Sequence, residues 1–147
     1  IAWMRDDLKN LSKETQVLVF LHIPLPEYDI LFKANTFHGL ALEAVCSPPL
    51  NSGLFSVLLE SGRCRGVFCG HDHINNFYGE LLGIALVYGQ ASGYGTYSTR
   101  GFKRGGRVIT LDPKMARGFK SQIFYEDGSA GENQEMAVSV GGWLDFE

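Results

Sequence analysis

The sequence lacks several features that would place it in a special class of protein. No apolar run approaches the ~20 residues needed to span a bilayer, so the chain has no membrane segment. Its three cysteines form no C-x-x-C pair, which argues against a disulfide framework and a zinc knuckle. The net charge of -3 is small, so nothing indicates nucleic acid as a partner. A folded domain with an ordinary core remains.

The chain also lacks an initiator methionine and a signal peptide. It opens with Ile1-Ala2-Trp3 inside a helical pattern, so we expect it to be a trimmed part of a longer protein, and its localisation stays unknown. The composition, 45% hydrophobic and 20% charged, is typical of globular proteins. We expect residues 1–147 to form the C-terminal part of a single domain, in which the polar stretch 126–147 is a flexible or peripheral tail.

The apolar periodicity predicts helices first and strands later. Ile1, Met4, Leu8 and Leu11 share one helical face, and residues 54–59 form a second helix that Asn51-Ser52 caps and Gly62 ends. Residues 16–21 and 66–69 are expected to be short buried strands. Because a helix connects them, we expect the two strands to pair in parallel. Residues 27–50 form a long loop with at most one helical turn. Further strands near 81–88, 107–111 and 119–125 give an α/β class tending to α+β.

Three of the four histidines follow the two buried strands directly. His22 follows the first strand, and His71 and His73 follow the second in the run Gly70-His71-Asp72-His73. Side chains at i and i+2 of an extended stretch point the same way, and Gly70 permits a sharp turn before them. Ligands of α/β sheets bind beyond the carboxyl ends of strands. We therefore expect the three imidazoles to meet at one rim as metal ligands.

The residues alone leave the kind of metal site open. Three imidazoles could hold one zinc ion, or serve two metals that share carboxylates from elsewhere. Asp72 either orients an imidazole or faces solvent. His38 lies in the irregular loop and is expected to be a surface residue.

Two other groups of polar residues carry weaker expectations. The basic residues near the last predicted strands, Arg100, Lys103, Arg104 and Arg107, are expected to be solvated. Cys69 ends a strand and is expected to be buried, whereas Cys64 lies between two arginines and is the more reactive thiol.

Several segments resemble a known superfamily. The run Val19-Phe20-Leu21-His22-Ile23-Pro24-Leu25-Pro26-Glu27 resembles the late histidine motif of calcineurin-like metallophosphoesterases, and Gly70-His71-Asp72-His73 resembles their closing Gly-His-x-His motif. Asn51-Ser52-Gly53-Leu54-Phe55, Gly93-Tyr94-Gly95 and Gly106-Arg107-Val108-Ile109 are similar to the purple-acid-phosphatase-like branch. The resemblance extends from the first helix to about Asp112.

The resemblance implies a four-layer α/β/β/α sandwich and a metal-dependent phosphoester hydrolase. It implies two metal ions (Mn, Fe or Zn), with His22 and His71 on one and His73 on the other. The family's aspartate, Gly-Asp and Gly-Asn-His motifs are absent from this sequence. The implied partners are therefore a phosphate-ester substrate and the missing N-terminal half of the domain.

Two alternatives remain, and some roles stay unassigned. The chain could be a catalytically inactive remnant or binding module of the same fold, or part of a mononuclear three-histidine zinc hydrolase. No residue is assigned here to substrate binding or to catalysis other than metal binding.

Overall fold

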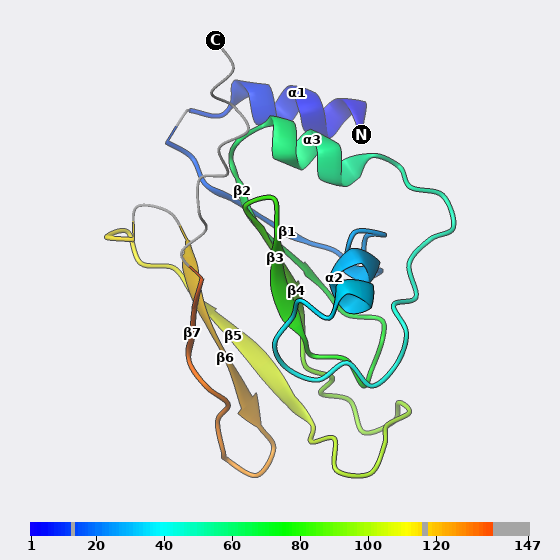
Figure 1. The fold of residues 1–147 in the computed structure, drawn as a ribbon. Helices are drawn as coiled ribbons and strands as arrows, with labels where there is room; N and C mark the ends of the chain where they lie inside the picture. The colour runs from blue at the N-terminus through cyan, green and yellow to red at the C-terminus, as the bar shows by residue number, and fades with distance from the viewer. Residues whose placement is uncertain (13, 116–117, 137–147) are drawn as a thin grey trace.

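The structure, a computed structural model, describes residues 1–12, 14–115 and 118–136. Figure 1 shows helices packed on one sheet and a second sheet on the other side of it. The helices are α1 (Ala2–Asn10), α2 (Tyr28–Ala34) and α3 (Leu54–Glu60). The strands are β1 (Val17–Phe20), β2 (Cys64–Cys69), β3 (Tyr78–Leu81), β4 (Ile84–Tyr88), β5 (Gly105–Thr110), β6 (Phe119–Tyr125) and β7 (Gln134–Met136).

The first sheet has the strand order β1-β2-β4-β3. β2 pairs in parallel with both β1 and β4, whereas β3 forms an antiparallel hairpin with β4. The predicted parallel pairing of the two strands that precede the histidines is confirmed. Both strands therefore present their carboxyl ends at the same edge of the sheet.

Alternating side chains of the central strands pack into two separate cores. Val67 and Cys69 of β2 and Leu86 of β4 face the helices, where they pack in one buried cluster with Leu58 of α3. Their neighbours in the chain, Phe68, Ala85 and Val87, pack instead with Phe119 of β6. This alternation is the period of two that a strand imposes. The described residues therefore form three layers, in the order helices, first sheet, second sheet.

The second sheet has the order β5-β6-β7 and is antiparallel throughout. It approaches the first sheet closely at Gly66, where an added Cβ would lie 2.9 Å from the Phe119 ring. The α/β class predicted from the sequence is confirmed. The three layers are consistent with part of an α/β/β/α sandwich; the described residues contain no second helical layer.

The expectation of a solvated basic cluster is wrong for two of its four members. Arg104 is buried and Arg107 is half-buried between the two sheets, whereas Arg100 and Lys103 are exposed. Arg107 of β5 donates to the carbonyl oxygens of Tyr88 and Asn76 and to the side chains of Ser121 and Gln134. Burial lowers its pKa to about 10, so the guanidinium is still charged at neutral pH. The charge is solvated by protein oxygens instead of water.

The helix α2 is longer than the single turn expected in the 27–50 loop. Tyr28 and Leu31 are almost fully buried, and the Tyr28 hydroxyl donates to the carbonyl of Val67 over 2.6 Å. Tertiary packing thus stabilises a short helix with weak sequence periodicity. Of the expected tail, residues 134–136 form β7 at the edge of the second sheet, and residues 137–147 lie outside the described residues.

The described helices are all too short or too polar to cross a membrane. The three cysteines are free, and only Cys46 is exposed. Cys69 is buried as expected, but so is Cys64, because its side chain faces the helical layer. Desolvation raises the pKa of Cys64 to about 11 despite the neighbouring Arg65, so the expectation of a reactive Cys64 was wrong.

The burial of these thiols predicts their order of reactivity. At pH 8 a maleimide should label Cys46 quickly, and Cys64 and Cys69 only when the domain unfolds. Mass spectrometry of peptides after timed labelling measures the three rates, with labelling in strong denaturant as the control. Labelling of Cys64 as fast as that of Cys46 in the native protein would contradict the packing described.

Candidate metal centre

Backbone pairing between β1 and β2 continues beyond their ends and brings His22 to the histidine loop. The amide of Leu21 donates to the carbonyl of Phe68, and the amide of Gly70 donates to the carbonyl of His22 over 3.0 Å. The amide of Gly89 in turn donates to the carbonyl of Cys69 over 2.7 Å. Three chain segments are therefore held side by side at this edge of the sheet.

The turn after β2 lies at His71 and not at Gly70 as expected. His71 has a φ of 73°, and the amide of Asp72 donates to the carbonyl of Gly70 over 2.9 Å, which closes a tight turn around His71. The stretch is consequently not extended, so the expected i, i+2 alignment of the two histidines does not apply. A positive φ in a residue with a Cβ is strained by roughly 1–3 kcal/mol, and such strain gathers at functional sites.

The structure nevertheless places all three predicted histidines around one cavity. His22, His71 and His73 line a hollow of about 200 Å³, whose other wall is formed by the segment Gly89 to Thr96. Nε2 of His22 lies 3.4 Å from Nδ1 of His71. His73 lies on the same rim with its Nδ1 atom buried and without a hydrogen-bond partner. His38 is exposed, as expected of a surface residue, and its backbone forms an isolated antiparallel β-bridge with Tyr78.

Asp72 is buried and does not face solvent. Its side chain is only 4% exposed, and Oδ2 accepts a 2.5 Å hydrogen bond from the Tyr88 hydroxyl and a 3.1 Å bond from the amide of Cys46. Burial, and then the Asp72 carboxylate, raise the pKa of Tyr88 far above its ordinary value. The hydroxyl therefore stays protonated as the donor, and Asp72 anchors the loop to β4.

Two residues beside His73 were not predicted from the sequence. The Tyr97 ring stacks on the His73 ring with centroids 4.3 Å apart, and its hydroxyl is bonded to the Glu43 carboxylate. Tyr97 lies in the glycine-rich segment assigned to turns, and Glu43 in the long irregular loop. No local pattern marks either residue, since the contacts span 24 and 54 positions in sequence.

The histidine geometry fits a metal ion. Two nitrogens that each lie about 2.1 Å from a tetrahedral ion are about 3.4 Å apart, the separation found for His22 and His71. The same distance also fits a hydrogen bond between a protonated and a bare nitrogen. The buried Nδ1 of His73 has no hydrogen-bond partner among the described residues, and a cation bound to it would satisfy it.

The three imidazoles do not bring three ligand atoms within 4.8 Å of one another, but another group among the described residues does. Atoms of Cys46, His71 and Asp72 lie within 4.8 Å of one another. The Asp72 oxygen that is hydrogen-bonded to Tyr88 and to the Cys46 amide already has two donors. We therefore take the three imidazoles, which line one cavity, as the better candidate set.

The chain is similar in sequence to three plant proteins. The chain is 48% identical over 92 residues to "Probable inactive purple acid phosphatase 14" of Arabidopsis thaliana, and 41% identical over 100 residues to "Probable inactive purple acid phosphatase 29". It is 32% identical over 123 residues to "Probable inactive purple acid phosphatase 28" of the same plant. Its homologues are purple-acid-phosphatase-like proteins. No protein-family model matches the chain.

The similarity covers much of this chain but little of each phosphatase-like relative. The three alignments include 63%, 68% and 80% of the chain and 23%, 26% and 30% of the respective relatives. The chain thus spans about a quarter of the length of the relatives it matches. The relatives' names describe them as inactive, so the homology establishes a phosphatase-like chain and not its activity.

The strained turn predicts an unusual order of stabilities at His71. Replacing His71 by glycine should leave the protein roughly 1 kcal/mol more stable than replacing it by alanine, because glycine adopts a positive φ without strain. Urea unfolding without added metal measures the difference. The same pair of substitutions at the exposed His38, which has no positive φ, should give the ordinary order, with alanine the more stable. If the alanine variant were the more stable one at both positions, strain at His71 would be excluded.

Proposed function

We propose that the protein containing this chain is a metal-dependent phosphoester hydrolase with a binuclear centre, to which this chain contributes His22, His71 and His73. The observation that carries the proposal is the meeting of these three side chains at one cavity beyond the ends of two parallel strands. Homology to purple-acid-phosphatase-like proteins supports the reaction class. His22 and His71 hold one ion and His73 the other.

Each histidine has a distinct task in this scheme. His22 and His71 present the two facing nitrogens, and the backbone pairing of β1 with β2 keeps their spacing. His73 offers its unpartnered Nδ1 from the other side of Asp72. The bound ions would supply Lewis acidity, polarising a phosphate ester and making water a stronger acid. The segment Gly89 to Thr96 forms the wall of the cavity opposite the histidines.

The remaining parts of such a site are to come from elsewhere in the protein. Neutral imidazoles do not balance the charge of two cations, and Asp72 is the single carboxylate among the described residues that line the cavity. The cavity of about 200 Å³ is also smaller than the ~300–1,000 Å³ of typical ligand pockets. β1 lies at a sheet edge with Phe20 64% exposed, which leaves room for further strands.

A catalytically inactive protein of the same fold is the second candidate. The names of the three relatives favour it, since each describes a probable inactive phosphatase. In this case the histidines would persist as a structural or ligand-binding feature without turnover. The two candidates differ in hydrolysis. A mononuclear zinc site differs from the binuclear hydrolase in that one ion is bound instead of two.

Metal content and turnover of the full-length protein test the proposal together. His71→Ala and His73→Ala should each lose about one bound ion, measured by mass spectrometry of the metals. Each should lower kcat on a generic aryl phosphate by more than about 100-fold, because removing a residue that merely supports a ligand already costs about 10–100-fold.

His38→Ala is the matched control and should change neither metal content nor rate, since His38 is exposed and away from the cavity. Full metal content and rate in His73→Ala would refute the two-ion assignment. Two bound ions without hydrolysis in the unaltered protein would favour the inactive alternative. A single bound ion that is lost when any one of the three histidines is replaced would favour a mononuclear site.

A further inference from the structure

Tyr97 contacts His73 in two independent ways. The two rings stack with an interplanar angle of 26° and centroids 4.3 Å apart, so Tyr97 covers one face of the imidazole. In addition, the backbone amide of His73 donates to the Tyr97 hydroxyl oxygen over 3.1 Å. The stacking restrains the ring plane of His73, and the hydrogen bond restrains the backbone from which that ring extends.

Glu43 fixes the Tyr97 hydroxyl in this position. The hydroxyl lies 2.8 Å from Oε2 and 3.0 Å from Oε1 of Glu43, to which it donates. The same carboxylate accepts the amide of Ile74, the residue after His73, over 2.9 Å. Glu43 therefore binds both the tyrosine and the histidine loop. Hydrogen bonds to an ionised acceptor are about twice as strong as neutral ones, which makes this an effective clamp.

The segment that carries Tyr97 is itself held rigidly. Arg104 is only 7% exposed, and its Nη2 donates to the carbonyl oxygens of Thr96 and Tyr97 over 2.8 and 3.0 Å. The Tyr97 ring is 53% exposed, so its position depends on these polar contacts more than on burial. An exposed aromatic ring with this many directed contacts to one histidine loop has a more specific task than filling a core.

We propose that Tyr97, locked by Glu43, is a positioning residue for His73, and that it sets the affinity of the ion that His73 binds. The inference rests on the proposed function, because it takes His73 as a ligand. The contacts of Tyr97 and Glu43 with the histidine loop lie at His73 and Ile74, whereas His22 is held beside the loop by the β1–β2 pairing. The two ions of the proposed centre thus depend on different supports, and Tyr97 acts on one of them alone.

The test measures Zn²⁺ bound to the full-length protein over a range of free Zn²⁺, which gives two binding constants without any assay of activity. Tyr97→Phe keeps the ring but removes the hydroxyl, and it should weaken one constant roughly 10-fold and leave the other unchanged. Tyr97→Leu also removes the stacking and should weaken the same constant further. Glu43→Gln keeps a side-chain oxygen that can accept the Ile74 amide. Combined with Tyr97→Phe it should therefore be close to Tyr97→Phe alone, because its remaining effect acts through the Tyr97 hydroxyl.

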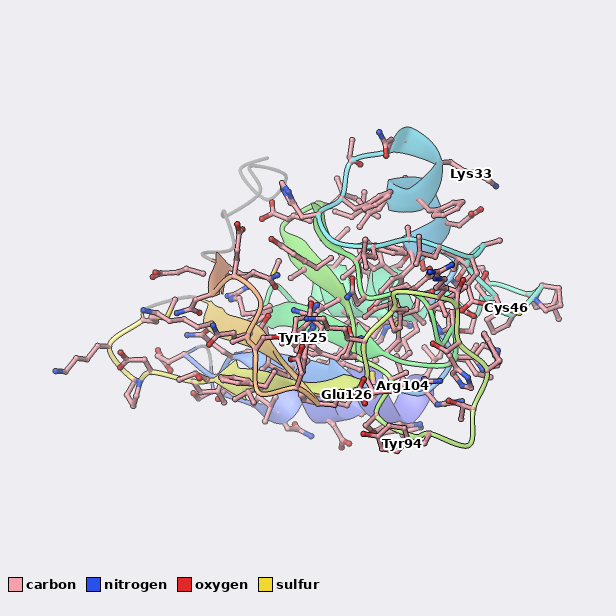
Figure 2. The ribbon with its side chains drawn as sticks, turned by 90° about the horizontal axis from the view of Figure 1, so that it is seen from below. Lys33, Cys46, Tyr94, Arg104, Tyr125 and Glu126 are labelled. Atoms are coloured by element: carbon pink, nitrogen blue, oxygen red, sulfur yellow. The ribbon has the colours of Figure 1, made fainter. Side chains whose placement is uncertain are left out.

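Tyr94→Phe is the matched control in the same segment. Tyr94 is 79% exposed, and Figure 2 shows it beside Arg104 and Glu126 at the outer edge of the molecule, so both constants should stay unchanged. The constant weakened by Tyr97→Phe should be the one that His73→Ala abolishes. Unchanged or equally weakened constants in Tyr97→Phe would overturn the inference alone, whereas two intact constants in His73→Ala would overturn the proposed function with it.

Discussion

The Tyr88 hydroxyl donates to the buried carboxylate of Asp72 over 2.5 Å, and the histidine loop depends on this bond. Tyr88 is the last residue of β4, in the middle of the hydrophobic core, whereas Asp72 separates His71 from His73. A buried carboxylate without such a donor would cost several kcal/mol. The bond therefore fixes the loop to β4, a strand whose residues are all buried, and so fixes the backbone on which His71 and His73 lie.

The same carboxylate also recruits the long loop between α2 and α3. By accepting the amide of Cys46 it draws that loop toward the site, and Glu43 on the same loop then reaches Ile74 and Tyr97. Figure 2 places Cys46 on this loop, well away from Lys33 of α2. A segment without regular structure thereby becomes a support for the site, as long loops in compact domains often do.

The sequence predicted the parts of this arrangement that depend on local pattern. Apolar runs gave the strands that precede His22 and His71, and the helix between them gave their parallel pairing. That pairing places His22 beside the loop that carries His71 and His73, because parallel strands end at one edge.

The sequence could not predict contacts between residues that lie far apart in the chain. The burial of Asp72 and Cys64 depends on partners in other elements, and so do the hydrogen bonds of Arg107 and the packing that stabilises α2. The turn at His71 was misplaced to Gly70 because glycine is the usual residue for a positive φ. Tyr97 and Glu43 carry no local signal, since each is identified only by the residue that it touches.

The central claim is that His22, His71 and His73 form one part of a two-ion centre. Anomalous diffraction from crystals of the full-length protein grown with Zn²⁺ or Mn²⁺ tests it most directly, because the metal's own scattering locates each ion. The account predicts two peaks about 3.5–4 Å apart, one bonded to His22 and His71 and the other to His73. A single peak among Cys46, His71 and Asp72, or no peak beside the three imidazoles, would contradict it.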